Sequence, residues 1–555
     1  MKRTNMTPAA TQAATATDVR GQRWARGRAA LGLRWWQFAA AFACTVLLLP
    51  GCASLPHGVI REPSRAVAAS GDTELGKLAI RSVPDPTLSG FRLLPVGSYA
   101  LNTRIELARR AQQTLDLQYY HIQDDATGLY VMRMLRDAGQ RGVRVRLLLD
   151  DLYTSGEDLL LLGLAATPNV EVRLFNPFAS GRDSLVERLA CSLLDFRRVN
   201  RRMHNKLLIA DSAMAVAGGR NLANEYFMRG AMENFVDLDT FVVGGVVPTL
   251  SAEFDQYWNS RHAYPVQSII GDAHSREELR ALFEQATGPL NAPPPDAPPP
   301  KDLLGYGPLT ADLDAGKLTL IWSTAQAYAD SPDRVDAPDV NGSPPLQQNG
   351  IVRRKVDEQI LGAQHEVVVA SPYLIPGDSS IQAIESSNDR GVHFTFITNS
   401  LAATDEPLAH TGYGRYRPGM LRLGVELFEL SPSRVSRNIG LGHFGHSIGR
   451  LHAKAVVVDR SVVFIGSMNF DPRSKALNTE MGLIIQSPEL AEQVLHLMDI
   501  IKHQGAYRPH LAHGGPGIEW TADAEDAPLT NEPHTSFWSR MLIDLVAPLV
   551  PESLL

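Results

Sequence analysis

The chain has little cysteine, with three in 555 residues, and no excess of positive charge, since its formal net charge is −7. So few cysteines exclude a disulfide framework and a four-cysteine zinc site. The negative balance argues against a protein that binds nucleic acid over its whole surface. Hydrophobic residues make up 44% and charged residues 20%, which excludes wholesale disorder, collagen and a multi-span membrane protein. At this length we expect two or more domains.

Residues 1–51 have the layout of an export signal. Seven basic residues and one acidic residue are present in this segment, and its apolar stretch from Trp35 to Leu49 is too short for a comfortable membrane span. The stretch ends in Leu49-Pro50-Gly51-Cys52, which resembles the lipobox of bacterial lipoproteins. We therefore predict a signal peptide over 1–51 and a lipid on Cys52, with an uncleaved N-terminal anchor as the alternative.

We predict that the protein lies in the cell envelope, where a lipid anchors it and it faces the periplasm. Ala53 follows the cysteine, and by resemblance to Gram-negative lipoproteins this gives no retention signal for the inner membrane. We therefore expect the outer membrane rather than the inner one. Cleavage would remove Cys44 and lipid would occupy Cys52, so Cys191 would have no disulfide partner.

The strongest signal of organisation is an internal repeat. The first copy reads His204, Lys206, Asp211, Gly218 and Asn221, and the second reads His452, Lys454, Asp459, Gly466 and Asn469. Every residue of the second copy follows its counterpart by 248 positions, which indicates duplication of a whole domain rather than an array of short repeats. Helical and strand patterns alternate around both copies, which predicts βαβ units and a buried mixed sheet in each half.

The composition divides the chain into six parts. We predict a signal peptide over 1–51, a lipidated N-terminal segment over 52–89, a first half over 90–288, a proline-rich linker over 289–316, a second half over 317–502, and a tail with a terminal helix over 503–555. The linker is interpreted as a spacer rather than a ligand for a proline-binding module. Residues 503–534 look irregular, and the apolar stripe of the terminal helix is interpreted as core packing rather than membrane contact. Its members are Phe537, Trp538, Met541, Leu542, Leu545, Val546 and Leu549.

Each copy of the repeat predicts a β-hairpin that carries polar side chains at one end. His204 and Lys206 are two positions apart before an apolar run, so their side chains project from one face of a strand. The chain then turns and returns to the Gly-x-x-Asn corner beside them. If the halves pack about a pseudo-twofold axis, two histidines, two lysines and two asparagines converge on one pocket.

Such a set suits a phosphodiester. Ammonium and amide groups neutralise and orient the nonbridging oxygens, while one neutral imidazole attacks phosphorus and the other, protonated, donates to the leaving oxygen. Lysine in its usual charged state is a poor zinc ligand, so we expect neither a metal nor a cofactor. A single copy of the motif would be a weak signal, whereas two copies with identical spacing are a strong one.

On these residues the sequence resembles the phospholipase D superfamily, from about residue 90 to 500. The resemblance implies an α/β fold of two phospholipase D-like sandwich halves, related by pseudo-twofold symmetry around one shared active site, and a covalent phosphohistidine. It assigns catalysis to His204, Lys206, His452 and Lys454, and phosphate binding to Asn221, Asn469 and Ser467. By the same resemblance His204 is the nucleophile. Gly219 stands where the family has serine, so one hydroxyl contact is expected to be missing.

Four carboxylates accompany these residues. Asp211 and Asp459 belong to the motif, and their place on the hairpin predicts structural hydrogen bonds rather than chemistry. In the family a carboxylate from the opposite half orients each imidazole, which implies Glu480 for His204 and Asp239 for His452, with Asp237 as the runner-up. The alternative is that these carboxylates are merely exposed at strand starts.

Within the superfamily the sequence is most similar to bacterial cardiolipin synthases of the class C type, with Gln118-Tyr119-Tyr120 and Ser371-Pro372-Tyr373 among the supporting stretches. This implies a membrane-tethered phosphatidyltransferase or phosphodiesterase with a phospholipid substrate, acting as a monomer. An exported nuclease of the same superfamily and a non-catalytic scaffold lipoprotein are the alternatives. The negative charge disfavours nucleic acid. A basic cluster, Arg197, Arg198, Arg201 and Arg202, precedes the first motif and suits either anionic head groups or a solvated loop.

Overall fold

The computed structural model describes residues 54–192, 195–271, 273–336, 350–437, 442, 444–512, 517–522 and 527–549. The predicted signal peptide and the predicted lipidation site, Cys52, lie outside these residues. From Leu55 on, the chain forms one compact unit. Among the described residues, no helix combines the length and the apolar character needed to cross a bilayer.

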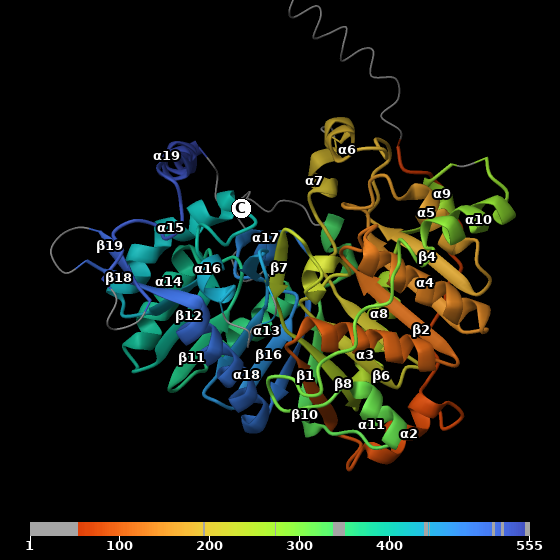
Figure 1. Cartoon of the computed structure of the whole chain (residues 1–555), viewed down its shortest axis with the longest axis horizontal. Helices are drawn as coiled ribbons and strands as arrows, with labels where there is room; N and C mark the ends of the chain where they lie inside the picture. Colours follow the sequence, from red (N-terminus) through yellow and green to blue (C-terminus); the bar gives the residue numbers. More distant parts are fainter. Residues whose placement is uncertain are drawn as a thin grey trace, which may run out of the picture. The chain divides into compact units, whose positions relative to one another are not determined.

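The first half begins with a short N-terminal helix and alternates helices with strands (Figure 1). Its strands are β1 (Ser89–Leu94), β2 (Thr114–Tyr119), β3 (Arg144–Asp150), β4 (Val170–Phe175), β5 (Leu207–Ala210), β6 (Met214–Gly218), β7 (Glu233–Val236), β8 (Asp239–Gly244) and β9 (Ala263–Pro265). Its helices are α2 (Glu74–Ser82), α3 (Gly97–Arg110), α4 (Ala126–Gln140), α5 (Asp158–Ala165), α6 (Leu185–Cys191), α7 (Phe196–Val199), η2 (Asn224–Phe227), α8 (Val247–Trp258), α9 (Val266–Ile269), α10 (Arg276–Ala286) and α11 (Leu309–Ala315).

The second half repeats this order of elements. Its strands are β10 (Ile321–Ala329), β11 (Glu366–Ala370), β12 (His393–Asn399), β13 (Glu426–Leu430), β14 (Ile448–Leu451), β15 (Ala455–Val458), β16 (Val462–Gly466), β17 (Met481–Gln486), β18 (Ala506–Leu511) and β19 (Ile518–Thr521). Its helices are η3 (Pro332–Asp336), α13 (Ile351–Leu361), α14 (Gly377–Asn388), α15 (Pro407–Arg422), α16 (Pro432–Val435), α17 (Pro472–Ala476), α18 (Pro488–Ile500), η5 (Ile501–Gly505), α19 (Phe537–Val546) and η6 (Ala547–Leu549).

Seventeen strands of the described chain form one mixed sheet with a pseudo-twofold order. The pairings run β9-β4-β3-β2-β5-β6-β8-β1 in the first half and β10-β17-β16-β15-β11-β12-β13-β18 in the second, with β19 at the far edge. β1 pairs antiparallel with β10, which joins the two series. In each half three parallel strands are followed by the antiparallel motif hairpin, as the duplication predicts. The mixed α/β fold of two repeated halves is confirmed.

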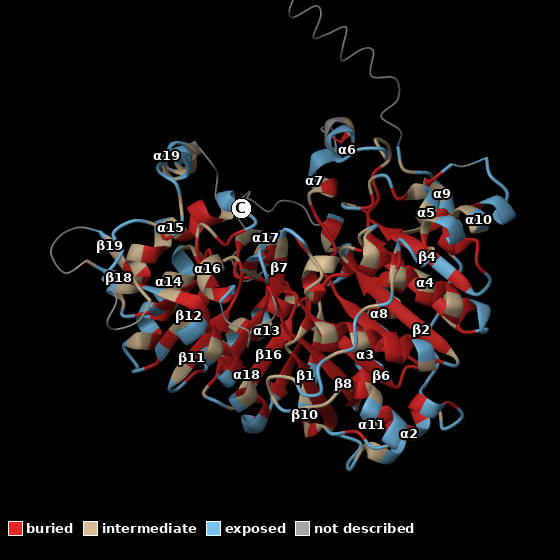
Figure 2. Cartoon of the chain, viewed as in Figure 1, coloured by how far each residue is buried: buried red, intermediate tan, exposed pale blue. Residues whose placement is uncertain are grey.

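Alternating side chains on the motif strands divide the core into an outer and a shared part. On β5, Leu208 packs against the helices of its own half, whereas Leu207 and Ile209 face a core that contains residues of both halves. On β15, Val456 likewise faces its own helices, and Val457 faces the shared core. In Figure 2 most of the central strands are coloured as buried. The two motif hairpins therefore meet across one apolar core, which brings their polar ends together.

The tail differs from its prediction. Residues 506–511 and 518–521 are not irregular, because they form β18 and β19, which extend the sheet of the second half and bury Trp520. The apolar stripe of α19 does not pack as a core helix either. Phe537, Trp538 and Leu545 are 63%, 70% and 69% exposed, although the helix contacts α15.

Candidate active site

The two motifs lie directly before the hairpin strands β5 and β15. Lys206 Nζ donates to the carbonyl oxygen of His204 at 2.6 Å, and Lys454 Nζ donates to that of His452 at 2.5 Å. All four side chains are buried. Because each lysine folds back on its own histidine in the same way, the two copies present matching His-Lys pairs.

Each motif aspartate holds the start of a neighbouring strand. Asp211 accepts hydrogen bonds from the backbone N–H groups of Gln112, Gln113 and Thr114, at 2.8–3.2 Å. Asp459 accepts the equivalent three bonds from residues 364–366, at 2.8–3.0 Å. Both lie in the hairpin turn with a positive φ, 50° and 48°. Both carboxylates therefore make hydrogen bonds that hold neighbouring strands.

The structure brings His204 and Glu480 together from opposite halves. His204 Nδ1 lies 3.0 Å from Glu480 Oε2. Ser467 and Ser474 donate to the two oxygens of the same carboxylate, at 2.5 and 2.7 Å. An isolated parallel bridge between Met203 and Thr479 sets this alignment, since it places the following residues, His204 and Glu480, side by side.

For His452 the structure corrects the prediction, because its partner is Asp237 and not Asp239. His452 Nδ1 lies 2.6 Å from Asp237 Oδ2. Asp239 instead pairs with Arg104 at 2.9 Å and with Arg220 at 3.2 Å. These arginines are buried, so Asp239 has a structural role in the first half.

The register between two strands explains why His452 meets Asp237. β7 and β14 pair in parallel with Leu451 opposite Val236, so the next residues, His452 and Asp237, meet. Gly218 lies opposite Asp239 on β8, and Gly466 lies opposite Gly482 on β17. Asp237 lies two residues before Asp239, and Glu480 lies two residues before Gly482. Asp237 and Glu480 therefore occupy equivalent positions in the two halves.

The departure at Gly219 is linked to this aspartate. A Cβ atom at Gly219 would lie 2.2 Å from Asp237 Oδ1. The serine at the equivalent position, Ser467, instead donates to the longer side chain of Glu480. One half thus combines a glycine with the shorter aspartate, and the other combines a serine with the longer glutamate. In both halves the carboxylate fits beside this motif position.

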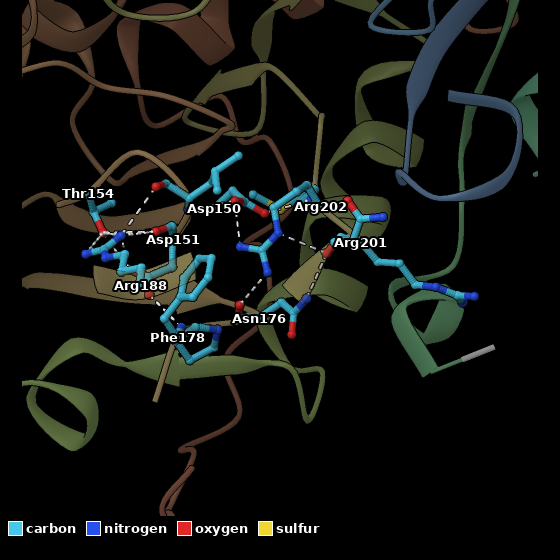
Figure 3. Close-up of polar contacts among 12 residues, drawn as sticks. Asp150, Asp151, Thr154, Asn176, Phe178, Arg188, Arg201 and Arg202 are labelled. Atoms are coloured by element: carbon cyan, nitrogen blue, oxygen red, sulfur yellow. Dashed lines mark hydrogen bonds and ion pairs between the residues drawn. The ribbon is translucent and has the colours of Figure 1, made fainter. Parts of the chain in front are cut away.

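Residues at the ends of β3 and β12 fix the segments before the histidines, and sequence reasoning missed them. Asp150 accepts from the Met203 N–H at 2.8 Å and pairs with Arg202, which also donates to the Asn176 carbonyl (Figure 3). In the second half Asn399 accepts from the Leu451 N–H at 2.8 Å. Each stands eight residues after the glycine that precedes its strand, a regularity that could have revealed the pair.

The basic cluster before the first motif is not a solvated loop throughout. Arg201 and Arg202 are 5% and 1% exposed. Arg201 donates to the Arg334 carbonyl, which links the two halves, and Arg202 pairs with Asp150. The predicted interpretations of the cluster, head-group attraction or a solvated loop, therefore fail for these two residues.

Aromatic rings contact both histidines. Tyr120 lies edge-on to His204 with ring centroids 5.0 Å apart, and Tyr226 does the same to His452 at 5.1 Å. Tyr226 also accepts a hydrogen bond from Asn221 Nδ2 at 2.9 Å. The side-chain oxygens of Asn221 and Asn469 are buried without a protein donor, so polar groups remain unsatisfied at this site.

The two histidine-carboxylate pairs differ electrostatically. Burial lowers the pKa of His204 well below its ordinary value, and the charges of Lys206 and Lys454 lower it further. Burial raises the pKa of Glu480 to about 7. These shifts favour a neutral imidazole at His204.

In the second pair the carboxylate keeps its charge. Burial alone would raise the pKa of Asp237, yet His452 and Lys454 hold it well below its usual range. Burial lowers the pKa of His452, while Asp237 opposes that effect. An imidazolium is therefore better supported at His452 than at His204. Burial also lowers the pKa of Lys454 to about 8.

Among the described residues, one cluster outside this site has metal-ligand spacing. It consists of His262, Asp333 and Asp336, with His262 Nε2 at 3.2 Å from Asp333 and 3.4 Å from Asp336. Arg261 pairs with both aspartates, so one of their two negative charges is offset. No motif residue belongs to this cluster.

Comparison with known proteins agrees with this geometry. The family model described as "Cardiolipin synthase, PLD-like domain" matches residues 105–258 and 356–501, one segment in each half. Cardiolipin synthase C of Escherichia coli (strain K12) is 36% identical over 466 residues, which cover 82% of this chain and 94% of that protein. An uncharacterized protein of Helicobacter pylori (strain ATCC 700392 / 26695) is 30% identical over 519 residues, 90% of this chain and 96% of that protein.

A solved structure supports the fold. The crystal structure of phosphatidylserine synthase from Haemophilus influenzae Rd KW20 superposes with a TM-score of 0.50 at 12% identity, covering 86% of this chain and 98% of that one. With two family segments that each hold one His-Lys motif, and a relative that matches along most of its length, the chain belongs to the cardiolipin synthase family of phospholipase D-like proteins.

Proposed function

We propose that the protein is a phosphatidyltransferase that acts on phospholipids through a phosphohistidine on His204. The observation that carries the proposal is the pair of imidazoles, each tied at Nδ1 to a carboxylate of the opposite half. With Nδ1 occupied, each ring keeps Nε2 for the reacting groups. The lysines of the two motifs supply positive charge for a phosphodiester.

The first step forms one bond and breaks another at phosphorus. Lys206, Lys454, Asn221 and Asn469 hold the nonbridging oxygens. The Nε2 lone pair of neutral His204 attacks phosphorus, and the head-group oxygen leaves with a proton from Nε2 of His452. The products are a phosphatidyl-histidine at position 204 and a free head-group alcohol.

The second step reverses these roles. His452, now neutral, takes the proton of an incoming hydroxyl, whose oxygen attacks phosphorus and releases His204. If that hydroxyl belongs to the head group of a second phospholipid, the product carries two phosphatidyl groups, and if it is water, the product is phosphatidic acid. The name of the Escherichia coli relative favours the first acceptor.

Membrane contact in this proposal has two sources. One is the lipid on Cys52, in an outer-membrane lipoprotein that faces the periplasm. The other is α19, whose exposed Phe537, Trp538 and Leu545 suit the interfacial zone of a bilayer. A monomer suffices for the chemistry, since one chain supplies both motifs.

The test is incubation of the purified full chain with phosphatidylglycerol in mixed micelles, with product analysis by mass spectrometry. We expect cardiolipin and free glycerol. Phosphatidic acid as the sole product would indicate a hydrolase instead. A parallel incubation with DNA distinguishes a nuclease, which would cleave the DNA and leave the lipid unchanged.

His204→Ala and His452→Ala are the matched variants for this assay. Each should lower turnover by several orders of magnitude, because nucleophile and acid are separate roles in one pathway. Near wild-type activity in either variant would contradict a shared site.

A further inference from the structure

The two halves present different side chains beside their motif asparagines. Isolated parallel bridges join the segments after β2 and β11 to the ends of the motifs: Ile122 with Leu222 in the first half, and Leu374 with Phe470 in the second. The residues before these partners therefore also lie side by side, His121 with Asn221 and Tyr373 with Asn469. His121 and Tyr373 thus occupy equivalent positions on the two sides of the site.

On the first-half side His121 contacts aromatic rings. The rings of His121 and Tyr153 have centroids 4.9 Å apart, and Tyr120 lies edge-on to Tyr153 at 5.4 Å. Burial and the charge of Lys206 lower the pKa of His121 to about 4, so its imidazole is neutral at physiological pH.

On the second-half side Tyr373 contacts a carboxylate instead. Its hydroxyl donates to Asp405 Oδ2 at 2.8 Å. Asp405 lies in the loop between β12 and α15 and is exposed, whereas Asn469 is 5% exposed. The carboxylate therefore stands on the solvent side of Tyr373, while the asparagine lies inside the site.

One oxygen of Asp405 is available to a ligand. In the part of the chain that the structure describes, Tyr373 is the only donor to its side chain, and no arginine, lysine or histidine forms an ion pair with it. Asn469 Oδ1 is buried and likewise has no donor among the described residues. An open carboxylate oxygen and an unsatisfied amide oxygen on the same side of the site suit a ligand that donates hydrogen bonds.

The charge of Asp405 acts on the His452 side of the site. Burial lowers the pKa values of His452 and Lys454, and the negative charges of Asp237 and Asp405 oppose this effect. Burial raises the pKa of Tyr226, whose ring contacts His452, and the charge of Asp405 raises it further. Asp405 therefore lies near the histidine that exchanges protons with the leaving and incoming alcohols in the proposed reaction.

We propose that Asp405 accepts a hydrogen bond from a second hydroxyl of the acceptor alcohol, so that the site selects polyols over alcohols with one hydroxyl. The inference rests on the proposed function, in which His452 takes the proton of the reacting hydroxyl. A glycerol head group has a neighbouring hydroxyl that does not react, and Asp405 Oδ1 accepts from it while Tyr373 holds Oδ2. Asp405 is thus a specificity-determining residue, and it is neither acid nor base in the transfer.

The experiment is transfer by the full chain from phosphatidylglycerol in mixed micelles to an equimolar mixture of deuterated glycerol and 1-propanol. Mass spectrometry measures the ratio of deuterated phosphatidylglycerol to phosphatidylpropanol. Both products arise from one phosphatidyl-enzyme intermediate, so this ratio reports acceptor choice and not the rate of the first step. We expect the wild type to favour glycerol and Asp405→Ala to lower the ratio about tenfold, as for loss of a hydrogen bond to a charged group.

Two further variants separate the hydrogen bond from a general effect of charge. Asp389→Asn removes an exposed carboxylate at the end of α14, the helix that begins shortly after Tyr373, and should leave the ratio unchanged. Tyr373→Phe removes the hydroxyl that orients Asp405 and should lower the ratio severalfold. An equal change in Asp389→Asn, or a wild-type ratio in folded Asp405→Ala, would overturn the inference.

A second mixture replaces 1-propanol by ethanolamine, because a carboxylate also suits an ammonium group. We expect glycerol to remain the preferred acceptor, and a preference for ethanolamine that Asp405→Ala removes would overturn the selection of polyols. If the wild type forms no transfer product with any acceptor, the proposed function fails and this inference fails with it. Transfer with an unchanged ratio in Asp405→Ala overturns this inference alone.

Discussion

Replacing Asp237 by asparagine removes the charge beside His452 while preserving its shape. Both side chains are buried, and their atoms lie 2.6 Å apart. At an effective dielectric constant of about 20, two unit charges about 4 Å apart interact by about 4 kcal/mol. Because about 1.4 kcal/mol corresponds to a factor of ten in rate, Asp237→Asn should lower kcat about 10³-fold. The assay is initial-rate release of glycerol from phosphatidylglycerol, with the unfolding temperature measured in parallel.

Asp239→Asn is the matched control, because it changes the carboxylate two residues away. Asp239 balances the buried Arg104 and Arg220, and removal of one partner from a buried ion pair costs about 3–5 kcal/mol of stability. This variant should therefore unfold at a clearly lower temperature. The reasoning is refuted if Asp237→Asn keeps kcat near that of the wild type, while Asp239→Asn loses it without a loss of stability.

Three further predictions concern pH, packing and metals. Burial lowers the pKa of Lys454 to about 8 and its ammonium is charged only below that value, so kcat/KM should fall as the pH rises above about 8; a rate that is constant from pH 7 to 9.5 would argue against this role. Gly219→Ser would bring a Cβ atom to 2.2 Å from Asp237, and a displacement of about 1 Å should cost about 10²-fold in kcat; an unchanged rate would show that the site accommodates the hydroxyl. Activity should survive a chelator, since lysine and asparagine offset the phosphate charge, and loss that one specific metal restores would contradict this mechanism.

Much of the site follows from the sequence because the motif is local and duplicated. A strand, a turn and a returning strand are fixed within 18 residues, so the relative places of His204, Lys206 and Asn221 follow from strand periodicity. The identical spacing in the second copy then predicts the partner half. Convergence of the copies follows from the symmetry of the duplication, which the sheet order displays.

The choice between Asp237 and Asp239 did not follow, because it depends on contact between the halves. His452 meets Asp237 only because β14 pairs in parallel with β7, with Leu451 opposite Val236. No periodicity within either segment indicates that register. Asp237 precedes β8 and Asp239 begins it, so their sequence positions do not distinguish them. The sheet pairings do, because they make Asp239 equivalent to Gly482, which has no carboxylate.

The tail and the basic cluster were misjudged for related reasons. β18 pairs with β13, more than 75 residues earlier in the chain, and its segment Ala506–Leu511 has no clear alternation of its own. Arg202 is buried because Asp150, at the end of a distant strand, neutralises it. Long-range pairing decided both outcomes, whereas composition alone favoured loops.

The central claim is that His204 forms the covalent intermediate. It is tested most directly by rapid acid- or base-quench of the full chain with ³²P-labelled phosphatidylglycerol, followed by proteolysis and mass spectrometry of the labelled peptide. We expect the label on the peptide that contains His204, and no label with His204→Ala. Label on the peptide that contains His452, or turnover with no labelled peptide at all, would contradict the account.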